Sequence, residues 1–256
     1  MTNSNDKMQA LPKGILFDLD DTIIAYDAVA AKAWRVACGE YAGGSGRVDT
    51  AALLDAIERV GNWYYSDAAR CKQARMNLRA ARREIVCLAL DRIGVNDPAL
   101  GCRIADVYSA RRDEFITLFP GAEQALSVLR EQGVAMALLT NGEAASQRAK
   151  IGRFGLERFF DVTLVEGELG MGKPDPAVYQ RALAGLGLKA ADAWMVGDNL
   201  EWDVAAPQRL GIRGIWNDYR RAGLPPDCPV RPDRIVHSIA ELAGVPVAAG
   251  AQGGGA

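Results

Sequence analysis

Short, almost continuously hydrophobic segments recur along the chain and predict buried β-strands. Five such segments lie at residues 14–17, 134–140, 162–165, 193–197 and 212–216. Strands that are buried on both faces of a sheet show this near-continuous hydrophobicity, whereas strands with one exposed face alternate apolar and polar residues. The sequence therefore predicts a sheet that is covered on both sides.

Helical patterns occupy the intervals between these strands. Helices are predicted at residues 122–131, 175–186 and 201–210, and the second shows apolar residues at helical spacing. Alternation of strands and helices implies right-handed crossovers and parallel strands. The expected fold class is α/β, with a doubly wound, Rossmann-like parallel sheet that binds ligands at the carboxyl ends of its strands.

One connection is far longer than the others. Roughly ninety residues separate the first strand from the helix before the second, whereas connections in α/β units usually have a few residues plus one helix. Helices are predicted within this insert at residues 28–40, 50–60, 68–93 and 98–114. We therefore expect a Rossmann-like core at residues 1–23 and 119–247, a helical cap domain at residues 24–118, and a flexible tail at residues 248–256.

Composition narrows the classes of function. The 256 residues include 30 Lys and Arg against 32 Asp and Glu, a formal charge of −2. Nucleic-acid binders usually have a net basic surface, so nucleic acid is not an expected partner. We find no signal peptide and no apolar run long enough to span a bilayer, so no membrane partner is expected either. The five cysteines form no CxxC pair, which favours reduced thiols and a cytoplasmic location.

Polar segments follow the first four predicted strands. They are Asp18-Leu19-Asp20-Asp21-Thr22, Thr140-Asn141-Gly142, Gly172-Lys173-Pro174-Asp175 and residues 197–203. The carboxyl ends of parallel strands meet at one edge of a sheet. Four carboxylates and one ammonium group are therefore expected to converge, from Asp18, Asp20, Asp198, Asp203 and Lys173.

Such a cluster of acids requires a cation. Two like charges about 4 Å apart repel by roughly 4 kcal/mol at an effective dielectric constant near 20. Oxygen ligands select a hard ion, and Mg²⁺ fits best because it retains waters and substrate phosphate oxygens in its coordination sphere. The sequence predicts Mg²⁺ as the cofactor.

In their order along the chain, the four segments resemble the motifs of the haloacid dehalogenase (HAD) superfamily. These are DxDxT at residues 18–22, Thr140, Lys173, and GDxxxxD at residues 197–203. The helical insert is similar to the superfamily's C1-type cap, so the resemblance covers nearly the whole chain. The resemblance is to a broad group of members that are similar to phosphoglycolate phosphatase and N-acylneuraminate phosphatase. The implied activity is Mg²⁺-dependent hydrolysis of a small phosphorylated metabolite.

The resemblance also implies roles for individual residues. Asp18 would be the nucleophile that forms an aspartyl-phosphate, and Asp20 would be the general acid and then the base. The transferring phosphoryl group would be bound by Thr140, Asn141 and Lys173.

The implied metal ligands come from the same segments. They are Asp18, the backbone carbonyl of Asp20, and Asp198. Asp203 would bind the ion through water or orient its ligands.

Other functions stay open at this point. A 2-haloacid dehalogenase or a phosphomutase would belong to the same superfamily, and a binding or regulatory module without catalysis is a third alternative. Asp20 favours a phosphate ester, because an alkoxide leaving group needs a proton and a halide does not.

Basic residues of the insert have two interpretations. Arg75, Arg79 and Arg82 fall on one face of the predicted helix at residues 68–93. This face would either attract an anionic substrate or be an ordinary solvated surface, and the second is the more usual outcome for a charged helix.

Overall fold

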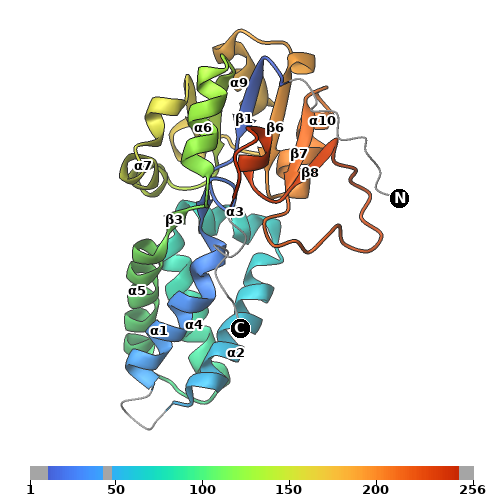
Figure 1. Cartoon of the computed structure of the whole chain (residues 1–256). Helices are drawn as coiled ribbons and strands as arrows, with labels where there is room; N and C mark the ends of the chain where they lie inside the picture. Colours follow the sequence, from blue (N-terminus) through green and yellow to red (C-terminus); the bar gives the residue numbers. More distant parts are fainter. Residues whose placement is uncertain (1–10, 43–47, 248–256) are drawn as a thin grey trace, which may run out of the picture.

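The computed structural model describes residues 11–42 and 48–247. Its main sheet consists of β1 (Gly14–Phe17), β4 (Ala135–Thr140), β5 (Val162–Val165), β6 (Ala193–Gly197), β7 (Arg213–Asn217) and β8 (Arg234–Val236). The strand order is β5-β4-β1-β6-β7-β8, and every neighbouring pair is parallel. Helices flank this sheet (Figure 1). The predicted α/β class with a doubly wound parallel sheet is confirmed.

Helices cover both faces of the sheet, as the continuous hydrophobic strands require. These are α6 (Ala122–Glu131), α7 (Ala144–Arg153), α8 (Glu166–Leu169), α9 (Pro176–Leu186) and α10 (Ala206–Gln208), with short 3₁₀ turns at Leu156–Phe159, Ala190–Asp192 and Ile239–Leu242. Along β1, Ile15 and Phe17 pack into the cluster under α6, whereas Leu16 packs into the cluster under α9. Alternate residues of one strand therefore enter two different cores.

The long insert forms a second body of helices, which lies beyond the carboxyl edge of the sheet (Figure 1). It contains a 3₁₀ turn (Asp27–Val29), α1 (Ala30–Ala42), α2 (Thr50–Tyr65), α3 (Ala68–Met76), α4 (Leu78–Arg92) and α5 (Pro98–Phe115). These helices enclose their own hydrophobic cluster, which includes Leu53, Ile85 and Ile104. Among the described residues, no helix is both long and apolar enough to cross a membrane.

Two short strands connect this helical body to the sheet. They are β2 (Ile24–Ala25) and β3 (Thr117–Leu118), which pair antiparallel. The two chain crossings thus lie side by side, near the predicted limits of the insert at residues 24 and 118. The division into core and cap domains stays a prediction, and the tail at residues 248–256 lies outside the described residues.

The predicted helix at residues 68–93 is wrong in one respect: it is two helices. Asn77 has φ −151° and ψ 70° and ends α3. Its side chain then accepts a hydrogen bond from Ala80 N at 3.1 Å, which caps α4. The arginines on either side of this break therefore do not share one helical face.

Other elements differ from the sequence prediction as well. The segment at residues 201–210 is a π-helical turn (Leu200–Ala205) followed by α10, where Pro207 has no N–H to donate. Helix α7 and strand β8 were not predicted. Helix α7 has the sequence AASQRAKIGR, which is largely polar and has Ile151 as its one large apolar residue.

Candidate active site

The ammonium group of Lys173 lies between two carboxylates in the centre of the site. Its Nζ is 2.7 Å from Asp18 Oδ1 and 2.6 Å from Asp203 Oδ1. Lys173, Asp18 and Asp203 are 3%, 7% and 0% exposed. Asp18 directly follows β1, and Lys173 lies in the loop after α8. Both ion pairs are therefore buried, and they join segments that are far apart in the sequence.

Gly197 explains how Asp203 comes so close to the end of β6. A Cβ atom added at Gly197 would lie 2.2 Å from the Asp203 carboxyl group, so no side chain fits there. Asn199 N donates to Asp203 Oδ2 at 3.0 Å. The Asn199 side chain also accepts from Glu201 N and Trp202 N. The segment at residues 197–203 thus turns back so that its two aspartates face the same site.

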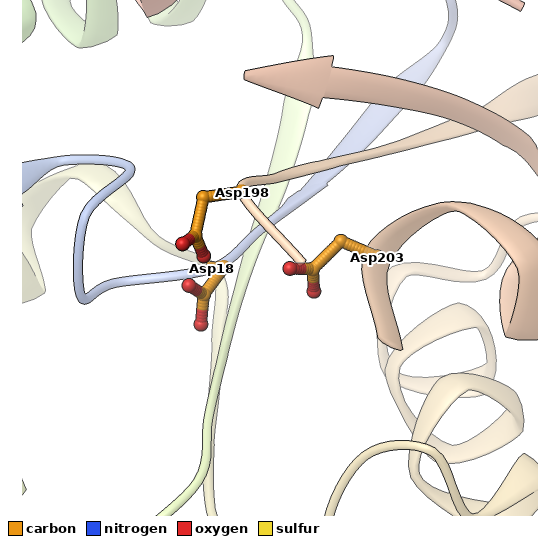
Figure 2. Close-up of side chains that lie close together, drawn as sticks. All are labelled: Asp18, Asp198 and Asp203. Atoms are coloured by element: carbon orange, nitrogen blue, oxygen red, sulfur yellow. The ribbon is translucent and has the colours of Figure 1, made fainter. Parts of the chain in front are cut away.

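Asp18, Asp198 and Asp203 form a group that could hold a metal ion. One carboxylate oxygen from each lies within 4.8 Å of the others. Figure 2 shows the Asp18 and Asp198 carboxylates adjacent, with that of Asp203 directed toward them. No hydrogen bond to the Asp198 carboxylate is found among residues 11–42 and 48–247. Three carboxylates face one ammonium group, and a divalent cation would neutralise the two remaining negative charges. The donor set fits a hard ion such as Mg²⁺.

Burial disfavours the charged forms of these acids. Desolvation raises the pKa of Asp18 to about 7, with Lys173 opposing the shift and Asp203 adding to it. Desolvation and repulsion from Asp18 and Asp203 raise the pKa of Asp198 to about 9. Although burial opposes it, the pKa of Lys173 is raised by its two carboxylate partners. The site therefore binds protons strongly when no cation is present.

Asp20 is held by two residues of α7. Lys150 Nζ is 2.7 Å from both oxygens of the Asp20 carboxylate. Gln147 Nε2 donates to Asp20 Oδ2 at 3.1 Å, to Thr140 Oγ1 at 2.5 Å and to Asn141 O at 2.7 Å. Sequence reasoning missed both residues because it missed α7. Gln147 therefore connects the first and second motifs, and Lys150 contacts the first.

The side chain of Asn141 is engaged with the backbone of Lys173. Asn141 Nδ2 donates to Lys173 O at 2.6 Å, and Asn141 Oδ1 accepts from Lys173 N at 2.8 Å. A Cβ atom at Gly172 would lie 2.6 Å from Asn141 Oδ1, so this approach requires glycine. These contacts give the Asn141 side chain a positioning role at Lys173, and its predicted contact with phosphate stays a prediction.

Comparison with known proteins agrees with the motifs and the geometry. Residues 12–211 match the model of the haloacid dehalogenase-like hydrolase family. The chain belongs to this family. The predicted assignment as a HAD-type phosphatase is confirmed at the level of family and enzyme class by its curated relatives.

Two relatives match along nearly their whole length. A phosphoserine phosphatase of Thermus thermophilus is 33% identical over 250 residues, which cover 90% of this chain and 97% of the relative. A glyceraldehyde 3-phosphate phosphatase of Methanopyrus kandleri is 28% identical over 243 residues, with coverages of 90% and 98%.

Solved structures show the same fold. A HAD-hydrolase of Bacillus subtilis superposes with a TM-score of 0.70 at 21% identity, covering 92% of this chain and 98% of its own. A 2-haloacid dehalogenase of Pseudomonas syringae pv. Tomato superposes with a TM-score of 0.57 at 29% identity, with coverages of 91% and 97%.

In this HAD-like hydrolase, a helix of the insert reaches the rim of the site. Arg75 of α3 contacts the buried Glu166 through Nε at 3.3 Å and a terminal nitrogen at 3.2 Å. Glu166 also accepts from Gly142 N at 3.0 Å, and Arg75 stacks 4.9 Å from the Trp202 ring. Arg75, Trp202 and the aspartates line a cavity of about 240 Å³. The sequence did not predict the part played by Arg75 and Glu166.

The raised pKa values predict how the stability of the metal-free hydrolase depends on pH. The folded-state pKa values of Asp18 (about 7) and Asp198 (about 9) exceed the ordinary value of 3.8. The folded state therefore holds more protons than the unfolded state in this window, and the free energy of unfolding falls as the pH rises. In EDTA, we expect the melting temperature to fall between about pH 5 and about pH 9, by roughly 10 to 30 °C.

Asp198→Asn removes one titrating group and should reduce this pH dependence. Thermal denaturation of both proteins at each pH measures the effect. Equal pH dependence in the wild type and in Asp198→Asn would contradict the assignment of the raised pKa to Asp198.

Proposed function

We propose that the protein is a Mg²⁺-dependent phosphomonoester hydrolase that acts on a small phosphorylated metabolite. The observation that carries this proposal is the pairing of Lys173 with Asp18 beside Asp198 and Asp203. A buried nucleophile, a fixed cation and a pair of further carboxylates are what phosphoryl transfer requires, because positioning and charge stabilisation dominate its catalysis.

Mg²⁺ would be held by Asp18, the backbone carbonyl of Asp20, and Asp198. Asp203 is fully buried and bonded to Lys173 and Asn199 N, so we assign it to orienting the site. When bound, the ion neutralises the acids and polarises the phosphoryl oxygens.

Asp18 would attack the phosphorus atom and form an aspartyl-phosphate. Lys173 holds the Asp18 carboxylate at 2.7 Å and balances the charge that the phosphoryl group brings. Thr140 is 3% exposed and is fixed by Gln147, so its hydroxyl would bind a phosphoryl oxygen. The backbone contacts of Asn141 would keep the loop around Lys173 in place.

Asp20 would transfer protons at the opposite side of the phosphoryl group. It would protonate the leaving oxygen and then take a proton from the water that attacks the aspartyl-phosphate. Lys150 and Gln147 fix the orientation of its carboxyl group. The helices α1–α5 would act as a cap that excludes water, hinged at the β2–β3 pair.

The relatives indicate the size of the substrate. Those that match along their length are named as phosphatases of phosphoserine and of glyceraldehyde 3-phosphate, both three-carbon phosphate esters. We propose a substrate of similar size for this chain. A cytoplasmic location and the lack of a nucleic-acid partner also stay predictions.

Asp18→Asn should lower the rate of p-nitrophenyl phosphate hydrolysis by a factor of about 10³ or more, because an amide oxygen is a poor nucleophile. Released p-nitrophenolate measures turnover, and circular dichroism verifies the fold. Asp175→Asn is the matched control, since Asp175 is exposed and caps α9 through Ala177 N, a contact that asparagine retains. Turnover by Asp18→Asn at the rate of the control would refute the assignment of Asp18 as the nucleophile.

Asp20→Asn should separate the two halves of the reaction. The p-nitrophenolate leaving group needs little protonation, so Asp18 can still be phosphorylated, whereas hydrolysis of the aspartyl-phosphate lacks its base. We expect a burst of about one p-nitrophenolate per enzyme followed by slow turnover, measured by stopped flow. A steady-state rate equal to that of the wild type would contradict the role of Asp20 as the base.

Removal of the metal with EDTA should silence hydrolysis, and added Mg²⁺ should restore it. Mg²⁺ should also raise the melting temperature, because it binds the folded state alone, and the increase should shrink in Asp198→Asn. Phosphate release and thermal denaturation measure the two effects. Full activity in EDTA would count against the metal site.

Dehalogenation is the second candidate, supported by the 29% identity to a 2-haloacid dehalogenase structure. The two reactions are distinguished by the group that leaves. Chloride release from 2-chloropropionate without phosphatase activity would establish the alternative, whereas the carboxyl group of Asp20 at the site favours the phosphate ester.

A further inference from the structure

A second cavity adjoins the proposed catalytic cavity. It has a volume of about 270 Å³ and lies between the helical insert and α7. The two cavities share part of their walls: Asp20, Tyr26, Asp27, Arg75 and Asn141. A substrate whose phosphoryl group lies at Asp18 would therefore extend its organic part past Asp20 into this second cavity.

Arg82 of α4 lines the second cavity and is a buried cation. It is only 8% exposed. Two of its five N–H groups donate to neutral oxygens, namely Ser109 Oγ and the Tyr26 hydroxyl, both at 2.9 Å. Within residues 11–42 and 48–247, no carboxylate lies within ion-pair distance of Arg82.

The other cationic side chains that line the second cavity each form an ion pair. Arg112 is paired with Asp27, Arg75 with Glu166 and Lys150 with Asp20. One further acid on the wall, Glu143, has an exposed side chain and makes no ion pair with the described residues. Arg82 is thus the buried cation of this cavity without a fixed counter-charge.

Burying a charge is unfavourable unless an opposite charge or hydrogen bonds compensate it. The neutral partners of Arg82 fix its guanidinium group but do not balance its charge. An anion entering the cavity would do so, and a carboxylate matches the planar fork of a guanidinium group. The cavity volume suits a fragment of a few atoms beyond the ester oxygen.

We propose that Arg82 binds a carboxylate on the leaving group, so that the substrates of this hydrolase are small phosphorylated carboxylic acids. The proposal rests on the proposed phosphatase function and adds the substrate class. Arg82 is then a specificity-determining residue contributed by the insert.

Two matched pairs of phosphate esters test this selectivity. The first pair is 3-phosphoglycerate and glycerol 3-phosphate, in which a hydroxymethyl group replaces the carboxylate. The second pair is O-phosphoserine and phosphoethanolamine, in which a hydrogen atom replaces it. With Mg²⁺ and the full chain, we expect the wild type to show a kcat/KM at least about 10-fold higher for the acid of at least one pair. Equal rates, or a preference for the compound without the carboxylate, in both pairs would overturn the proposal.

Arg82→Gln should reduce this ratio of kcat/KM values by about 10- to 100-fold, with the loss concentrated in KM for the acid. Arg82→Lys retains the charge without the planar fork and should give an intermediate ratio, which also serves if the glutamine variant folds poorly. Released phosphate and circular dichroism are the measurements. An unchanged ratio in both variants would refute the role of Arg82.

Arg79→Gln is the matched control on the same helix. The Arg79 side chain is 67% exposed and is paired with Asp106, so this change should leave both rates as in the wild type. The measurements distinguish a failure of the proposed role of Arg82 from a failure of the proposed phosphatase function. A wild type that hydrolyses p-nitrophenyl phosphate but ignores the carboxylate contradicts only the role of Arg82, whereas a wild type inactive on every phosphate ester contradicts the phosphatase itself.

Discussion

A single ammonium group, that of Lys173, holds together charged groups that would otherwise repel one another. Burying ions stabilises a fold only where geometry and hydrogen bonding are good. Here both distances from Lys173 Nζ to its carboxylates are below 2.8 Å. The register of β1 against β6 places Asp18 beside the start of the segment at residues 197–203. The glycines at positions 172 and 197 leave the space that the loops need. Much of the fold around the carboxyl edge of the sheet is thus constrained by one buried charge.

The acids at this edge could be predicted because their positions follow from topology. Once parallel strands are inferred from hydrophobic runs, whatever follows each strand must meet at one edge. That reasoning brought Asp18, Asp198, Asp203 and Lys173 together, and the structure does so too. Reasoning from strand ends does not predict a residue that reaches the site from the middle of a helix.

Helix α7 shows the limit of hydrophobic periodicity as a signal. It is largely polar, yet two of its polar residues, Gln147 and Lys150, are buried at the site. Polar residues that are buried for function give the same pattern as a solvated loop, so only the three-dimensional partners reveal them. The position of Arg75 relative to Arg79 and Arg82 is mispredicted for a different reason. A continuous helix at residues 68–93 makes Arg75, Arg79 and Arg82 equivalent, whereas the break at Asn77 changes the direction of the chain.

Tyr26 links recognition in the second cavity to chemistry in the first. It follows β2 directly, where the chain enters the insert. Its hydroxyl accepts from Arg82, while Lys150 Nζ lies 4.1 Å from the centre of its ring. Lys150 in turn holds Asp20 at 2.7 Å. In the proposed mechanism, an anion on Arg82 and the proton donor for the leaving oxygen are therefore separated by one aromatic side chain.

A leaving group that is bound by its carboxylate would bring its ester oxygen to Asp20, because the two cavities meet at the wall that Tyr26 and Asp20 share. Binding energy from a part of the substrate that does not react would then serve to orient the bond that breaks.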